Sequence, residues 1–164
     1  MIQNHEIDYF LHGEEMQCVE IELDPQETVI AEAGSFMYMD NGIEMQTIFG
    51  DGSQEQSGGF MGKLFSAGKR LLVGESLFMT AFTNVGQGKK KVSFASAYTG
   101  KIIVFDLKEL GGKIIAQKDA FLCAAKGVSV GIALQRRLGT GLFGGEGFIM
   151  QKLEGDGMAF MHAG

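Results

Sequence analysis

Apolar and polar residues alternate with a period of two through most of the chain, which is the pattern of β-strands that bury one face. The alternation is clearest over residues 7–11 and 16–23, with His12, Gly13 and Glu14 as a turn between them. Further apolar or alternating runs predict strands at residues 28–31, 36–39, 43–48, 76–83, 92–96 and 102–105. Because long helical patterns do not alternate with these strands, we expect an all-β fold with a minor helical insert, not a parallel α/β sheet.

Turn residues separate the predicted strands. Asp24-Pro25 and the segment from Asn84 to Gly88 are two such turns. Asp40-Asn41-Gly42 is a strong hairpin signal, and it stands between the strands predicted at 36–39 and 43–48.

Residues 60–73 are the best helix candidate, since apolar residues recur there at three- and four-residue spacing. Basic residues occupy the rest of its surface, so the segment could lie on an anionic membrane. We favour the alternative, in which the apolar stripe is buried in the core or in a subunit interface. The candidate interface or membrane-facing residues are Phe60, Lys63, Leu64, Phe65, Lys69, Arg70 and Leu71.

The sequence contains an internal repeat. Val29-Ile30-Ala31-Glu32, Phe36 and Gly42-Ile43-Glu44-Met45 recur at one offset of 85 residues, as Ile114-Ile115-Ala116-Gln117, Phe121 and Gly127-Val128-Ser129-Val130. The pattern predicts one domain over residues 1–164, with two β repeats at about 16–98 and 101–164. Packed face to face, the repeats would form a duplicated β-sandwich or barrel-like core.

Glu75 and Glu146 occupy the same place in the two repeats, after Gly74 and Gly145. Two carboxylates could act as a general acid and base. We favour a structural role, in which each acid accepts backbone N–H bonds at a turn or pairs with a nearby Lys or Arg.

The charge of the chain changes sign along its length. Residues 1–62 hold 13 of the 20 acidic residues and no Lys or Arg, whereas residues 63–164 hold all 14 basic residues. The net charge of −6 argues against a nucleic-acid partner. In one interpretation the two parts fold against each other and their surface charges interleave. In the other, the acidic face of one copy meets the basic face of the next.

The length of 164 residues suits one domain. Cys18 and Cys123 each lie in apolar sequence, so we expect free buried thiols in a reducing compartment. The N-terminus lacks the regions of a signal peptide, and no apolar run approaches the roughly 18 residues that span a bilayer. A cytoplasmic location follows as the expectation.

The sequence does not match the patterns that are typical of nucleotide or metal binding. Five residues separate Gly62 from Gly68, and Arg70 follows Lys69, so the Walker pattern is not met. Residues 139–144 match G-x-G-x-x-G but lead into a predicted strand, not into a helix that could hold a pyrophosphate. His5, His12 and His162 have no metal-ligand spacing with each other or with either Cys. We therefore predict no catalytic residues, metal or cofactor.

One long motif is distinctive enough to indicate a protein family. The stretch GGFMGKLFSAGKRLLVGESLFMTAFTN, residues 58–84, resembles the altered inheritance of mitochondria 24 family, whose bacterial members form a domain of unknown function. Supporting similarity lies in Gly34–Met39, Gly42-Ile43, Gly144–Phe148, Gln151–Leu153 and Phe160–Gly164.

The resemblance implies an all-β duplicated fold like that of the tryptophan RNA-binding attenuation protein. It also implies ring-like self-association and, in eukaryotic members, a mitochondrial role in inner-membrane organisation. Members of the family continue past the His-Ala-Gly point with another β segment, so the resemblance implies that such a segment is missing here. It supplies no enzymatic activity and no catalytic residues.

These observations favour a non-enzymatic, self-associating β-scaffold, a homo-oligomer that works through its surfaces. The alternative is a module that holds a small or lipid-like ligand in an apolar pocket between the repeats, which abundant Met and Phe would suit. A weak enzyme that uses Glu75 or Glu146 is the third hypothesis.

Overall fold

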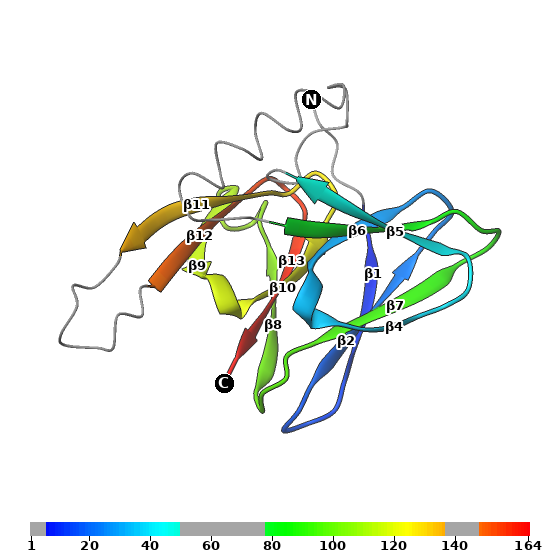
Figure 1. Cartoon of the computed structure of the whole chain (residues 1–164), viewed down its shortest axis with the longest axis horizontal. Helices are drawn as coiled ribbons and strands as arrows, with labels where there is room; N and C mark the ends of the chain where they lie inside the picture. The colour runs from blue at the N-terminus through cyan, green and yellow to red at the C-terminus, as the bar shows by residue number, and fades with distance from the viewer. Residues whose placement is uncertain (1–5, 50–77, 137–147) are drawn as a thin grey trace.

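The computed structural model of the chain describes residues 6–49, 78–136 and 148–164 (Figure 1). The described residues form thirteen strands and two short 3-10 turns, so the predicted all-β class is confirmed. The helical insert predicted at 60–73 lies outside the described residues.

The strands follow the period-two pattern closely. Each of the eight strands predicted individually is present, and its first and last residues differ from the predicted ones by at most two positions. The turn predicted at His12, Gly13 and Glu14 begins at Gly13, because His12 still pairs with Cys18 as part of the first strand. The first seven strands are β1 Asp8–His12, β2 Cys18–Leu23, β3 Thr28–Glu32, β4 Phe36–Met39, β5 Ile43–Phe49, β6 Phe78–Asn84 and β7 Lys90–Ala95. The other six are β8 Lys101–Asp106, β9 Lys113–Gln117, β10 Phe121–Ala125, β11 Ser129–Arg136, β12 Phe148–Glu154 and β13 Met158–Ala163. The 3-10 turns are η1 Ala33–Ser35, between β3 and β4, and η2 Lys118–Ala120, between β9 and β10.

The strands form three antiparallel sheets (Figure 1). One sheet has four strands in the order β1-β2-β7-β4, and another has three in the order β11-β12-β9. The third has six strands in the order β5-β6-β3-β10-β13-β8.

The six-stranded sheet is the middle layer, because it buries side chains on both faces. Along β3, Val29 and Ala31 belong to the hydrophobic cluster shared with β2 and β7, whereas Ile30 belongs to the cluster shared with β11 and β12. All five residues of β10 are buried. Strands buried on both faces have continuous apolar sequences, and β3 and β10 show that composition.

Two sets of strands share one pairing order. The order β2-β7-β4 in the first set matches β8-β13-β10 in the second, and β5-β6-β3 matches β11-β12-β9. The middle sheet combines β5-β6-β3 of the first set with β10-β13-β8 of the second. The junction is the antiparallel pair β3–β10, with Ala31 opposite Cys123, Ile30 opposite Ala124 and Val29 opposite Ala125.

The prediction of a hairpin at Asp40-Asn41-Gly42 was wrong. β4 pairs with β7 and β5 pairs with β6, so this turn carries the chain from the four-stranded to the six-stranded sheet. The Asp40 carboxylate accepts the Lys91 N–H at 2.8 Å, and the Asp40 N–H donates to the Lys91 carbonyl at 2.9 Å. These two bonds hold the turn against β7, and Gly42 supplies the positive φ of 99° that the reversal requires.

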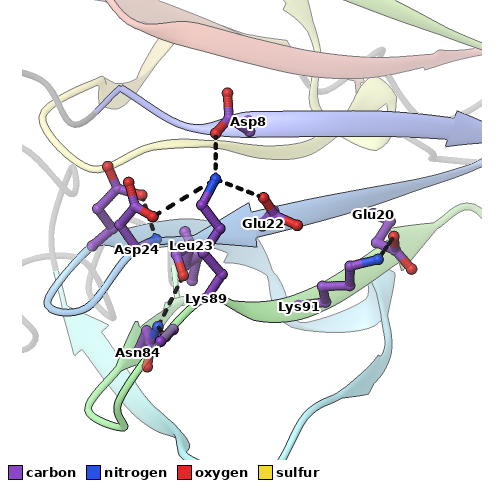
Figure 2. A network of polar contacts seen from close by, with 10 residues as sticks. Asp8, Glu20, Glu22, Leu23, Asp24, Asn84, Lys89 and Lys91 are labelled. Carbon is purple, nitrogen blue, oxygen red and sulfur yellow. Dashed lines mark hydrogen bonds and ion pairs between the residues drawn. The ribbon is translucent and has the colours of Figure 1, made fainter.

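Asn84 ties the end of the middle sheet to the end of the four-stranded sheet (Figure 2). Its fully buried side-chain amide donates to the carbonyls of Leu23 and Gly88, each at 2.8 Å, and its side-chain oxygen accepts the Gly86 N–H at 3.0 Å. Its own backbone bonds the turn after β2, through Gln26 and Glu27. One side chain therefore satisfies three backbone groups where two turns meet.

We predict that Asn84→Ala lowers the free energy of unfolding by about 2–3 kcal/mol, because the Leu23 and Gly88 carbonyls lose their donor. Urea denaturation followed by circular dichroism measures the change. Asn41→Ala, at an exposed turn position, is the control and should shift the free energy by no more than about 0.5 kcal/mol. Equal shifts in the two variants would contradict the role given to Asn84.

Candidate functional site

The site residues proposed from sequence fall outside the described part of the chain. This applies to Phe60, Lys63, Leu64, Phe65, Lys69, Arg70 and Leu71, and to the acids Glu75 and Glu146. The candidate sites below come from other residues, which were not among the site residues proposed from sequence.

Strands β4 and β9 present open edges. β4 ends the four-stranded sheet beyond β7, and β9 ends the three-stranded sheet beyond β12, with no further strand paired to either among the described residues. Open edges expose unpaired backbone N–H and C=O groups, which can pair with another chain.

Apolar side chains are exposed along both edges. Met37 and Tyr38 of β4 are 49% and 47% exposed, and Ile115 of β9 is 55% exposed. Proteins usually protect a free edge with charged residues or Pro, but β4 has neither, and β9 exposes a large apolar group beside Lys113. The sequence held a signal for this feature, since Phe36 to Met39 is apolar at four consecutive positions and Ile114-Ile115 is an apolar pair.

A cavity of about 720 Å³ lies between the two strand sets, beside residue 164, whose end is marked C in Figure 1. Its lining includes η1 and η2 residues, the segment that follows β7 and the end of β13. The lining residues are Glu32, Gly34, Ser35, residues 95–99, residues 117–122 and residues 162–164. It therefore mixes charged and hydroxyl groups with apolar ones, whereas the sequence analysis expected an apolar pocket.

Hydrogen bonds fix the cavity walls. The buried Ser35 hydroxyl lies 2.8 Å from the Glu32 carbonyl and 3.0 Å from the Leu122 carbonyl, so it joins η1 to β10. The His162 Nε2–H donates to the Thr99 carbonyl at 3.1 Å. Beside them Gly100 has a φ of 149°, and a Cβ there would lie 2.4 Å from the Ala163 carbonyl oxygen, so this approach requires glycine.

Glu32 is the half-buried carboxylate of the cavity. Burial raises its pKa above the ordinary value, against the opposing attraction of Lys118, while Asp119 raises it further. No hydrogen bond or ion pair joins this carboxylate to another described side chain. Glu32 is therefore a partly desolvated carboxylate with no ion-pair partner among the described residues.

The outer face of the four-stranded sheet carries a charge network (Figure 2). Lys89 lies 3.0 Å from Glu22, 3.7 Å from Asp8 and 3.9 Å from Asp24. Lys91 lies 2.8 Å from Glu20, and this bond lowers the pKa of Glu20 against the opposing effect of burial.

This network pairs acids of residues 1–62 with lysines from the later part of the chain. Among the described residues, the two oppositely charged parts therefore interleave within one copy, as in the first interpretation of the charge distribution. Exposed pairs of this kind add little to stability.

Three further structural facts concern candidate chemistry. Cys18 and Cys123 are both free, and burial raises the pKa of the Cys123 thiol well above its ordinary value. Within residues 6–49, 78–136 and 148–164, no group of three or more His, Cys, Asp or Glu residues is placed to hold a metal ion. Nor does that part of the chain contain a helix long and apolar enough to cross a membrane.

Comparisons with known proteins give a family and a fold. A family described as mitochondrial biogenesis AIM24 matches residues 9–164. None of the curated proteins matches the chain. The structure is similar to the crystal structure of a Streptococcus pyogenes protein, with a TM-score of 0.67 and 20% sequence identity over 96% of this chain. The chain spans 65% of the length of that protein, and at this identity the likeness shows the fold alone.

We predict that Glu32→Gln stabilises the chain at neutral pH. Because the folded pKa of Glu32 is raised, its contribution to stability is fully present below the unfolded pKa and is lost as pH rises through the folded value. Gln has no charge to desolvate, so the variant should melt above the parent at pH 7, and the difference should vanish near pH 4. Thermal unfolding across this pH range is the measurement. Glu44→Gln, at an exposed carboxylate, is the control, and a destabilised Glu32→Gln protein would contradict the prediction.

Proposed function

We propose that this chain, which belongs to the mitochondrial biogenesis AIM24 family, is a non-enzymatic scaffold that associates with further copies of itself through the open edges of β4 and β9. The observation that carries the proposal is the β3–β10 pair, which joins the corresponding edges within one chain.

We interpret the two strand sets as two repeats of one unit. At an offset of 85 residues, β3 corresponds to β9 and β4 corresponds to β10, and the two sets share one pairing order. β3 of the first repeat pairs with β10 of the second. By the same rule, β9 of one copy should pair with β4 of the next.

The correspondence gives a residue-by-residue register for this pairing. Ala31, Ile30 and Val29 lie opposite Cys123, Ala124 and Ala125 inside the chain. The equivalent contacts between copies place Ala116 opposite Tyr38, Ile115 opposite Met39 and Ile114 opposite Asp40.

Burial supports the same assignment. Ile30 and Cys123 are buried in the internal pair, whereas their equivalents Ile115 and Tyr38 are about half exposed. Leu122 is also buried, and its equivalent Met37 is exposed. At each of these equivalent positions the side chain in the internal pair is buried and its counterpart at the open edge is exposed. The exposed apolar side chains are the ones that a second copy would cover.

The contact is head-to-tail, because one copy offers β9 and its neighbour offers β4. Such heterologous contacts form a ring when the rotation per copy closes and a filament when it does not. The contact consists of backbone pairing and apolar burial, and the ion pairs of Figure 2 are already formed within one copy. We therefore expect assembly to persist at high salt.

We predict that Ile115→Lys converts the assembly to monomers, because it places a charge at the centre of the β9 edge. Ile132→Lys is the matched control: Ile132 lies in β11 on the other side of β12 and is 39% exposed. Light scattering at micromolar concentration, in low and high salt, gives the solution mass. A parent chain that is strictly monomeric would overturn the proposal, and equal dissociation by both variants would show that β9 is not the contact.

The register can be tested by cross-linking. In a Cys18→Ser background, we predict that Tyr38→Cys combined with Ala116→Cys gives disulfide-linked multimers under mild oxidation, because directly opposed residues bring their Cβ atoms within about 4.5–5.5 Å. Non-reducing electrophoresis reads the product. The control pair, Tyr38→Cys with Ile114→Cys, shifts one partner by two residues and should link poorly. Equal yields from the two pairs would refute this register.

A further inference from the structure

We propose that the cavity between η1 and η2 binds a small organic ammonium ion, with the Glu32 carboxylate as its counter-charge and residues 95–98, at the end of β7 and just after it, against its apolar part. This inference does not rest on the proposed self-association: Gln117 at the end of β9 lines the cavity, but Met37, Tyr38 and Ile115 do not.

The charge of the cavity selects a cation. Glu32 is half-buried and has no hydrogen-bond or ion-pair partner among the described side chains, so a ligand cation would supply the contact that it lacks. Lys118 also lines the cavity but acts on Glu32 only through a longer-range attraction that burial outweighs. A carboxylate partly removed from water forms stronger charge-assisted hydrogen bonds than one in bulk solvent.

The composition of the lining favours an organic cation over a metal ion. Glu32 and Asp119 are the side-chain carboxylates in the lining, and among the described residues no group of three or more His, Cys, Asp or Glu is placed to hold a metal ion. Half-buried Ala95 and the exposed Ala97 and Tyr98 offer apolar surface instead. An alkyl chain on one side and an ammonium group on the other match these two parts of the wall.

The volume and the rigidity of the cavity suit a small ligand. Small-molecule sites occupy roughly 300–1,000 Å³ and are usually formed before the ligand binds, and this cavity measures about 720 Å³. The bonds of Ser35 to β10 and of His162 to the Thr99 carbonyl join separate segments of the lining without a ligand. The hydroxyl groups of Ser96 and Thr99 add polar groups that can orient the bound molecule.

The test uses n-butylammonium as the probe and follows the backbone amides of Gly34, Ala97 and Asp119 by two-dimensional NMR. We expect saturable shifts with n-butylammonium, and weak or no shifts with its neutral and anionic counterparts n-butanol and butyrate. Glu32→Gln should weaken binding by roughly tenfold or more, since it removes the charge but keeps the shape. Because that variant is expected to be more stable than the parent, weaker binding could not be attributed to unfolding.

Two control variants decide the outcome. Glu44→Gln removes an exposed carboxylate outside the cavity and should leave binding unchanged. Ile115→Lys should also bind as the parent does, whether or not it alters assembly, so this inference and the proposed function can fail separately. No saturable shift, an equal response to n-butanol, or unchanged binding by Glu32→Gln would each overturn the proposal.

Discussion

The antiparallel pair formed by β3 and β10 is the contact on which the described structure depends. It joins strands about ninety residues apart in sequence, and it turns two three-stranded halves into one six-stranded sheet. Both strands are buried on both faces, so each backbone group that left this ladder would lie unpaired in an apolar interior. The two outer sheets have no common core without this middle layer, because each hydrophobic cluster takes more than half of its buried residues from it.

The individual strands could be predicted from sequence because their signal is local. A half-buried strand such as β2 alternates apolar and polar residues, and this alternation can be read from the sequence without knowing which strand it pairs with. The choice of partner is not local, and this is why the hairpin expected at Asp40-Asn41-Gly42 was wrong. The turn residues indicate a reversal, but β7, which receives β4, lies some fifty residues further along the chain.

The cavity could not have been predicted for the same reason. Glu32, Ser96, Lys118 and His162 come from four separate segments, and nothing in their local sequence brings them together. The charge distribution was visible in the sequence, but its consequence was not. Lys89 and Lys91 reach acids on β1, β2 and the turn after β2 only because β7 pairs with β2. The sharp division of charge between the two parts of the chain therefore disappears on the folded surface of this sheet.

Cys123 gives the middle sheet a built-in chemical reporter. Its thiol is fully buried in β10, directly opposite Ala31, and burial raises its pKa well above the ordinary value. A thiol reacts as its thiolate, so labelling of Cys123 must wait until the central pair separates. Cys18, half-buried at the start of β2, does not share that protection. The ratio of the labelling rate of Cys123 to that of Cys18 would thus report how often β3 and β10 separate under native conditions.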